Sequence, residues 1–377
     1  MDPIFLVLAA IPLAAAGIQF ILLPRTFSWR EAAVQGLLCT LIVVVVWNFG
    51  RYADAGDVEI WNGSVSAKEA IRKDCPYGWV QSTDRHCTHY RTRSVKAGET
   101  CSTVDGERVC TPYYRTEYDY IYPWEQRYWI VSRDIDLRLE YTRVDPQGVR
   151  TPPTFAAISV GDPAARTMAY DNWVRGAADS LFHEDGATAE RYADLIPEYP
   201  IALYDGINVD RVIGVGVPID ARSWSRDLSR SLSTLGPQRQ MNAVLLLVDA
   251  AKMNEDYIYA VRRAWRGFKK NDVVLFVGVD ADLAVRWVRS LSWSSSSMFD
   301  VAMQNDLQDL RGQPLTSAAV NEILLRNGMA HYQRRSMKEF EYLKESIPVP
   351  GWLYALVALL SIGGTAGVSY IFHRTEF

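Results

Sequence analysis

Three aspartates stand where the sequence could support catalysis. Asp249 directly follows the apolar run at 243–248, and Asp280 and Asp282 directly follow a second run at 273–279. If both runs are parallel strands, their carboxyl ends meet at one edge of a sheet, where such sheets bind ligands. Three carboxylates there suit Ca²⁺ or Mg²⁺, or acid/base chemistry on a phosphate ester. The alternative is structural, because Asp commonly caps helices and turns after strands.

No other catalytic pattern in the sequence is stronger. There is no GxSxG nucleophile motif, and the pair Gly214 and Gly216 lacks the third glycine of a dinucleotide-binding loop. A net charge of −4 without a block of Lys and Arg excludes the usual signature of a nucleic-acid-binding protein. Binding without chemistry, and therefore without a cofactor, is the favoured function.

Four of the five cysteines lie close together and predict two disulfides in an oxidising compartment: Cys75, Cys87, Cys101 and Cys110. The alternative is zinc, since His86 and His89 flank Cys87. However, the segment has no CxxC or HxxxH pair of the kind that zinc sites use. Three connectivities remain open for two disulfides.

An aromatic stretch follows the cysteines. Tyr118, Tyr120, Tyr122 and Trp124 alternate with other residues, so in a single strand the four rings would line one face. Such a face could bind sugar rings or the apolar patch of a partner. The alternative is that it forms the buried side of a small sheet.

The elements around these residues indicate two modules. Residues 57–150 predict a small β-rich unit with strands at 58–65, 113–122 and 128–143, in which disulfides compensate for a scarcity of aliphatic residues. Residues 151–206 are rich in Pro and Gly and predict a linker with a helix at 188–196.

Residues 207–347 predict an α/β domain. The expected order is a strand at 211–217, a helix at 221–235 capped by Asp220, a strand at 243–248, a helix at 256–268 and a strand at 273–279. Strands that are apolar throughout and separated by helices favour a parallel βαβαβ sheet. A helix at 283–290, a strand at 298–303 and a helical stalk after Pro314, broken at Asn327 and Gly328, are expected to follow.

Uncharged apolar segments at 4–24, 32–50 and 351–372 each match the roughly 20 residues of a membrane-spanning helix. The segment at 4–24 lacks the positive start of a cleaved signal peptide, so we expect three retained transmembrane helices. Arg25, Arg30 and Arg374 lie in the short segments that should face the cytoplasm. This places the N-terminus and residues 51–348 outside, in agreement with the clustered cysteines.

One part of the chain resembles a known family. Met241-Asn-Ala-Val-Leu-Leu-Leu-Val248, Arg263-Ala-Trp265 and Lys269-Lys-Asn-Asp-Val-Val-Leu-Phe-Val-Gly278 resemble the core of TPM domains, which are membrane-anchored α/β modules. Some members are acid phosphatases, and others serve assembly or repair without chemistry. This chain has Asp280-Ala-Asp282 where such domains continue with glycines, which argues against a phosphatase site.

The whole layout resembles a group of membrane proteins of bacteria and their large tailed phages that has no assigned activity. The resembling segments include the cysteine cluster, Glu59-Ile-Trp61-Asn62-Gly63, Leu235-Gly236-Pro-Gln and Met337-Lys-Glu-Phe-Glu-Tyr-Leu343. The resemblance implies this architecture and a location in the cell envelope, and we expect the bacterial inner membrane.

Together these patterns predict a membrane-anchored α+β protein with three transmembrane helices, a disulfide-stapled β module and a TPM-like α/β outer domain. We expect it to bind another envelope protein or a cell-wall component. Assembly into a homo-oligomer is a further expectation. The alternative is a metal-dependent phosphatase-like hydrolase that uses Asp249, Asp280 and Asp282 with Ca²⁺ or Mg²⁺.

Overall fold

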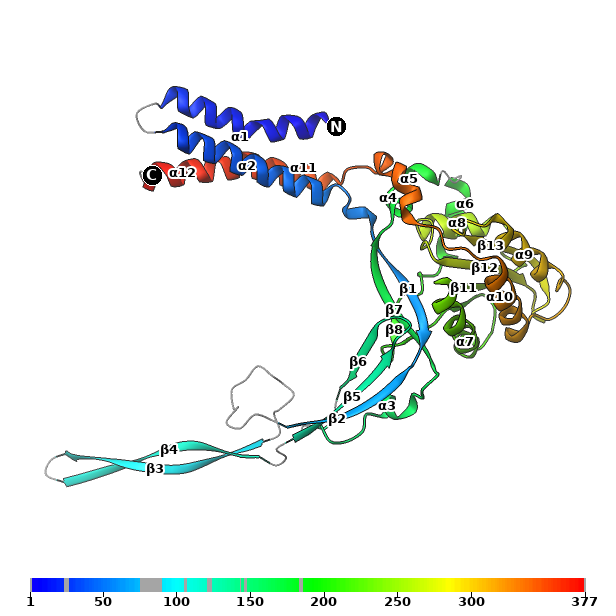
Figure 1. Ribbon diagram of the computed structural model, residues 1–377, viewed down its shortest axis with the longest axis horizontal. Coiled ribbons are helices and arrows are strands. Elements are labelled where there is room, and N and C mark those ends of the chain that lie inside the picture. The colour runs from blue at the N-terminus through cyan, green and yellow to red at the C-terminus, as the bar shows by residue number, and fades with distance from the viewer. Residues whose placement is uncertain are drawn as a thin grey trace.

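Three long apolar helices form one end of the molecule (Figure 1). The computed structural model describes residues 2–23, 27–74, 90–104, 107–120, 124–142, 144–145, 148–182 and 186–375. The helices are α1 (Pro3–Leu22), α2 (Trp29–Gly50) and a third made of α11 (Gly351–Leu359), the π-helical turn η5 (Leu360–Gly364) and α12 (Thr365–Thr375). Each is long and apolar enough to cross a membrane, as the sequence predicts.

The three helices pack around a small apolar core. Phe5 stacks on Trp47 with ring centroids 4.4 Å apart, and Val43, Leu353 and Val357 are buried beside them. Most other apolar side chains of α1 and α2 are exposed. Such a surface is unfavourable in water and is expected in lipid, so the bundle indicates a membrane protein.

The N-terminus lies at the end of the bundle that faces the rest of the protein, and the C-terminus lies at the far end (Figure 1). The hydroxyl of Tyr354 donates to the carboxylate of Asp2, which ties the start of α1 to the start of the third helix. The N-terminus and the body therefore lie on the same side of the bundle.

Short helices form a collar between the bundle and the body: η1 (Ala53–Ala55), α4 (Trp173–Gly176), α5 (Ala178–Leu181) and η4 (Met337–Ser346). Their apolar side chains share one core that includes Trp173, Phe340 and Ile347. Because α2 enters the collar through η1 and α11 leaves it after η4, both connections to the bundle are fixed to the body.

A two-stranded antiparallel ribbon leads away from the collar. It pairs β1 (Gly56–Ser64) with β7 (Pro163–Asp171), from Gly56 opposite Asp171 to Ser64 opposite Pro163. The strand at 58–65 is thus confirmed. However, β7 lies in the segment predicted as a linker, because its partner is about a hundred residues earlier in the chain and no local pattern reveals that pairing.

The ribbon leads into a three-stranded antiparallel sheet of β2 (Ala67–Asp74), β5 (Trp124–Ser132) and β6 (Leu137–Tyr141). Its core contains Val65, Ile130 and Ile207, with Phe155 from α3 (Pro153–Ala157). The short pair β8 (Leu203–Tyr204) and β9 (Asn208–Val209) lies nearby. The strand expected at 128–143 is therefore two strands, β5 and β6, joined by a turn at 133–136.

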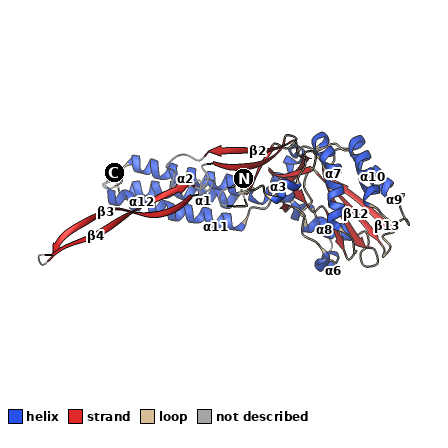
Figure 2. Ribbon diagram, turned by 90° about the horizontal axis from the view of Figure 1, so that it is seen from below, coloured by secondary structure: helices blue, strands red, loops and turns tan. Residues whose placement is uncertain are grey.

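A long hairpin projects from this sheet and is called the arm here. It consists of β3 (Tyr90–Val104) and β4 (Glu107–Tyr120), and most of its described side chains are exposed. Figure 1 shows the arm pointing away from the α/β domain and running in the same direction as the helix bundle, apart from it; in Figure 2 the arm and the bundle overlap. At about 3.3 Å per residue, its strands extend roughly 50 Å.

The α/β domain is built on a four-stranded sheet in the order β10-β11-β12-β13. The elements are β10 (Val212–Val215), α7 (Ala221–Arg239), β11 (Asn242–Asp249), α8 (Tyr257–Ala264), β12 (Asp272–Val279) and β13 (Val285–Ser292). The first three strands are parallel, which confirms the predicted βαβαβ unit, and Asp220 caps α7 as expected. α6 (Gly186–Arg191) and η3 (Ala193–Leu195) precede the domain.

Both faces of this sheet are covered. On one face α7, α9 (Ser297–Gln308) and α10 (Ser317–His331) share a core with Leu245 and Leu275. On the other face α8 packs against Val244 and Phe276. Since α7 and α8 lie on opposite faces while the strands follow in order, the two crossovers have opposite hands.

Several predicted elements differ from the structure. Residues 283–290 belong to strand β13 instead of a helix, and 298–303 belong to helix α9 instead of a strand. Helix α7 continues past Pro237 to Arg239, where Gly236 allows close packing because a Cβ there would lie 2.1 Å from the carbonyl oxygen of Asn62. Helix α10 also runs unbroken through Asn327 and Gly328.

Candidate functional site

At the carboxyl edge of the sheet, Asp249 and Asp280 have separate local partners, and Asp282 is exposed. Asp249 accepts a hydrogen bond from the backbone N–H of Ala251 at 3.0 Å, and its other oxygen lies 3.3 Å from the ammonium of Lys252. Asp280 accepts from the N–H groups of Asp282 and Ala284 at 3.0 and 2.9 Å, while the side chain of Asp282 is exposed. Asp249 and Asp280 therefore cap turns in this structure, as the structural alternative predicts.

These three carboxylates do not form a metal-ligand cluster. Within the described ranges, the one group of three possible ligands with donor atoms within 4.8 Å is Glu99, Cys101 and Cys110, on the arm. The two cysteines there are joined by a disulfide, so neither offers a thiolate. Hydrogen bonds from Ala284 and the charge of Arg286 lower the pKa of Asp280, which keeps it ionised and unsuited to act as a general acid.

The arm contains one of the predicted disulfides. Cys101 and Cys110 are directly opposite each other near its tip and are bonded. Cys75 and Cys87 lie outside the described residues, as do His86 and His89. A two-stranded hairpin has marginal stability alone in water, so the covalent link supports a structure that no core sustains.

The residues of the predicted aromatic face do not lie in a single strand. Tyr118 and Tyr120 end β4, Trp124 begins β5 in the neighbouring sheet, and Tyr122 lies outside the described residues. The guanidinium of Arg72 lies 5.0 Å from the ring centroid of Trp124. The alternation in the sequence crosses a junction between two strands, so the four rings do not form a single face of one strand.

Exposed rings lie instead in the middle of β4. Tyr113 and Tyr114 are 55% and 61% exposed, and as neighbours in a strand they point to opposite faces of the arm. Tyr113 lies over Gly98, where a Cβ would come within 2.6 Å of its hydroxyl oxygen. Arg93 and Arg115 both pair with Glu117, at 3.0 and 2.8 Å. The arm thus presents an aromatic ring on each face, between charged side chains.

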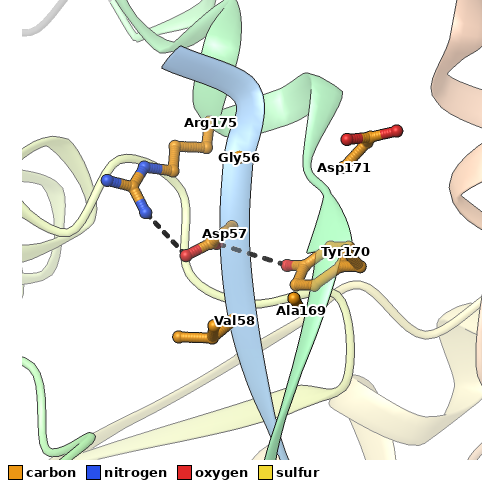
Figure 3. A pocket seen from close by; sticks show the side chains of 7 residues that line it. All are labelled: Gly56, Asp57, Val58, Ala169, Tyr170, Asp171 and Arg175. Atoms are coloured by element: carbon orange, nitrogen blue, oxygen red, sulfur yellow. Dashed lines mark hydrogen bonds and ion pairs between the residues drawn. The ribbon is translucent and has the colours of Figure 1, made fainter. Parts of the chain in front are cut away.

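A second feature is a cleft beside the ribbon, close to the collar (Figure 3). It has a volume of about 670 Å³ and is lined by β1 and β7 residues and by Arg175. Figure 3 shows Asp57 between Arg175 and Tyr170, with Asp171 pointing away from them. The guanidinium of Arg175 lies 2.6 Å from the Asp57 carboxylate, and the hydroxyl of Tyr170 donates to it at 3.4 Å.

Asp57 is a buried anion with two cationic partners. Besides Arg175, the ammonium of Lys269 contacts its carboxylate, and Asn172 donates to it at 2.9 Å. Burial raises the pKa of Asp57, but the hydrogen bond and charge of Lys269 outweigh burial and lower it overall. The carboxylate is therefore ionised at neutral pH and hydrogen-bonded on both oxygens, which suits a structural joint more than proton transfer.

A second acidic residue of β1 repeats this arrangement. Glu59 is buried, contacts the guanidinium of Arg334 and lies 3.6 Å from the ammonium of Lys270. Because Asp57 and Glu59 lie two apart in a strand, both point to the same face and meet the consecutive lysines that precede β12.

A buried polar chain continues this contact into the α/β domain. The guanidinium of Arg211 donates to the side-chain oxygens of Asn62 and Asn242, and Asn242 donates to Asp272 at 2.9 Å. The hydroxyl of Tyr199 also donates to Asp272. Burial raises the pKa of Asp272 to about 6 and lowers that of Arg211 to about 10. We call these contacts, with the Asp57 and Glu59 pairs, the buried joint.

Comparison with protein-family models, curated proteins and solved structures found no match to this chain. Two features remain as candidates for function: the buried joint, which holds the ribbon to the α/β domain, and the arm.

The sequence reading missed the buried joint because its members come from distant segments. One signal was present: Asp57 and Glu59 alternate with Val58 and Ile60 at the start of a predicted strand, and Lys269 and Lys270 stand just before a fully buried strand. Opposite charges beside two buried strands indicate a buried ionic contact.

Proposed function

We propose that this chain is an integral membrane protein that uses its arm to bind another protein during assembly of an envelope complex, without chemistry of its own. The observation that carries the proposal is the exposure of the arm: none of the described helices or strands packs along it, and it presents Tyr113 and Tyr114 on opposite faces. Exposed aromatic side chains are typical anchors of protein interfaces.

The open edges of the arm support the same function. A two-stranded ribbon leaves unpaired backbone N–H and C=O groups along both sides, and such edges bind partners by adding a strand. Charged side chains such as Arg93, Lys96 and Glu99 exclude the arm from hydrocarbon, so its partner is met in the aqueous phase. Another envelope protein fits this description better than a lipid.

The buried joint contributes by holding the base of the arm in place. The ribbon β1–β7 connects the collar to the sheet from which the arm projects, and the α/β domain clamps β1 through Asp57, Glu59 and Asn62. A partner bound to the arm would therefore be kept at a defined position relative to the membrane helices.

The proposed orientation has the N-terminus and the body outside the cytoplasm and the C-terminus inside, in a bacterial inner membrane. It rests on Arg25, Arg30 and Arg374 in the short segments and on the disulfide of the arm. A reporter that is active only in the cytoplasm, fused after Phe377, should be active. An inactive fusion, with a periplasmic reporter active in its place, would reverse the orientation.

Photo-crosslinking in intact host cells tests the binding function. A photoreactive amino acid in place of Tyr114 should give a discrete adduct of higher mass. The matched control is Tyr259, which is 43% exposed on the α/β domain and should give none. The proposal fails if neither position gives an adduct, or if both give the same one.

A further inference from the structure

A separate cleft lies at the carboxyl edge of the parallel sheet, on the α/β domain. Its volume is about 510 Å³, within the range of small-molecule sites. Asn254 and Glu255 line it from the connection between β11 and α8, Arg286 from the start of β13, and Gln308 and Arg311 from the end of α9 and the turn after it. Parallel sheets generally bind ligands at this edge.

Asn254 is held with its amide nitrogen free. Its side-chain oxygen accepts a hydrogen bond from the backbone N–H of Asp256 at 3.3 Å, whereas the single proton of the Tyr192 hydroxyl, 2.9 Å away, is donated to the nearer carboxylate of Asp256 at 2.6 Å. The bond from the Asp256 N–H orients the carboxamide, because only the amide oxygen can accept it. The described parts of the chain provide no acceptor for its NH₂ group, which leaves two N–H donors for a ligand.

Arg286 is oriented in a similar way. Its Nε donates to Asp280 at 2.9 Å, and one terminal nitrogen contacts the same oxygen. Asp280 is itself fixed by the backbone N–H groups of Asp282 and Ala284. The other terminal nitrogen of Arg286 has no acceptor in the described ranges, so the guanidinium is positioned with donors to spare.

Two further side chains that line the cleft, those of Arg311 and Gln308, are also unused donors. The guanidinium of Arg311 and the carboxamide of Gln308 have no hydrogen-bond or ion-pair partner among the residues that the structure describes, and Arg311 is exposed. The carboxylate of Glu255 is neutralised by Arg289, at 2.5 Å. Arg286, Arg289 and Arg311 carry three positive charges. The carboxylates of Asp280 and Glu255 carry two negative charges, so one positive charge is in excess.

A flat aromatic side chain completes the wall of the cleft. Trp287 lines it, donates from its indole nitrogen to the carbonyl of Met253 at 3.0 Å, and lies over Gly278. A Cβ on Gly278 would come within 2.1 Å of that nitrogen, so the glycine is required for the ring to lie there. The indole is therefore held rigidly beside the donors.

We propose that this cleft binds the phosphate group of a small molecule. Two guanidinium groups and two carboxamides offer more donors than the two oxygens of a carboxylate can use, whereas a phosphate has enough acceptor oxygens for all four groups. The ring of Trp287 bounds the space for the rest of the molecule. The site is independent of the arm, so it adds a ligand to the proposed binding function.

Isothermal titration calorimetry with inorganic phosphate tests the site. The full-length protein in detergent micelles is titrated at constant ionic strength, with chloride as the reference anion. We expect saturable binding in the millimolar range, which corresponds to about −4 kcal/mol. Arg311→Gln should weaken binding about tenfold, since it removes one charge-assisted contact. Asp280→Asn should weaken it less, because it only releases Arg286.

The control is Arg326→Gln on α10, where Arg326 is exposed and pairs with Asp306 instead of facing the cleft. It should bind phosphate as the unaltered protein does. The proposal is overturned if millimolar phosphate gives no more heat than chloride. It is also overturned if Arg311→Gln and Arg326→Gln bind phosphate equally well.

Discussion

Asp57 and Lys269 are 212 positions apart in the sequence and form a buried ion pair at the centre of the joint between ribbon and α/β domain. One follows the second membrane helix almost directly, and the other precedes the central strand β12. Through this pair the ribbon, which follows the second membrane helix, is fixed to the α/β domain.

Asp57→Asn should lower the free energy of unfolding by about 3 kcal/mol, because it leaves the buried ammonium of Lys269 without a counter-charge, while the partly exposed Arg175 is solvated by water. Lys269→Met should cost a similar amount. The double variant should cost less than the sum of the two, since the charges then disappear together. Denaturant unfolding of the full-length protein in micelles measures all three.

Asp171→Asn is the matched control, since Asp171 is exposed in the same cleft and should change stability by less than about 0.5 kcal/mol. Additive costs for the Asp57 and Lys269 variants would contradict a coupled pair.

The stability of the protein should rise as the pH falls from 7 to 5. Burial raises the pKa of Asp272 from 3.8 to about 6 in the folded state, so folding favours its protonated form below that pH. The expected gain is about 1 kcal/mol. The lowered pKa of Asp57 acts in the other direction, but only below about pH 4, where its contribution is lost.

Asp272→Asn isolates this effect, because it removes the titrating group while other carboxylates remain. Its unfolding free energy should lack the rise between pH 7 and pH 5. If the variant and the unaltered protein show the same pH dependence, Asp272 does not titrate as described.

Loss of the disulfide should open the arm and leave the body intact. The bond closes a short loop and contributes roughly 2–3 kcal/mol to a hairpin that has no core. In the Cys101→Ser, Cys110→Ser variant, trypsin should therefore cut faster at Arg93, Lys96 and Arg115, while the thermal midpoint of the body is unchanged. Equal cleavage with and without the disulfide would show that the arm is stable by other means.

A polar cluster should stabilise the helix bundle. The hydroxyl of Ser369 accepts hydrogen bonds from Gln19 at 2.8 Å and Gln35 at 2.9 Å, which links all three helices. Ser369→Ala should cost about 0.6–2 kcal/mol, as interhelical hydrogen bonds in membranes do. Gly363→Ala is the control in the same helix, because a Cβ there meets nothing within 4 Å. Equal thermal midpoints of the two variants in micelles would contradict this role.

The sequence predicted correctly those segments whose secondary structure follows from their own residues. The three apolar helices and the strands β10, β11 and β12 carry their own signal, since continuous apolar runs must be buried or lie in lipid. A helix was expected over β13 because strands and helices alternate up to that point, whereas β13 follows β12 directly as an antiparallel strand with a register shift at Gly278 and Val279. Periodicity cannot separate a helix from a strand in eight residues.

The functional features depended on contacts that sequence patterns do not contain. The pairing of β1 with β7, the ion pair of Asp57 with Lys269 and the approach of α7 to Asn62 each join segments more than a hundred residues apart. In contrast, the pairing of Cys101 with Cys110 is local, and it was one of the connectivities left open. Asp249, Asp280 and Asp282 lie at the ends of strands, as predicted. They do not form a metal-ligand cluster, because Asp249 and Asp280 bind separate local partners.

The most direct test of the central claim is the size of the complex that contains this protein. The protein is extracted from its host membrane in a mild detergent, and its native mass is compared with that of a variant in which a short Gly-Ser turn replaces residues 92–118. We predict that the unaltered protein elutes as a larger assembly and the variant at the mass of its own micelle, with the same thermal midpoint of the body. Identical native masses for the two proteins would contradict an arm that binds a partner.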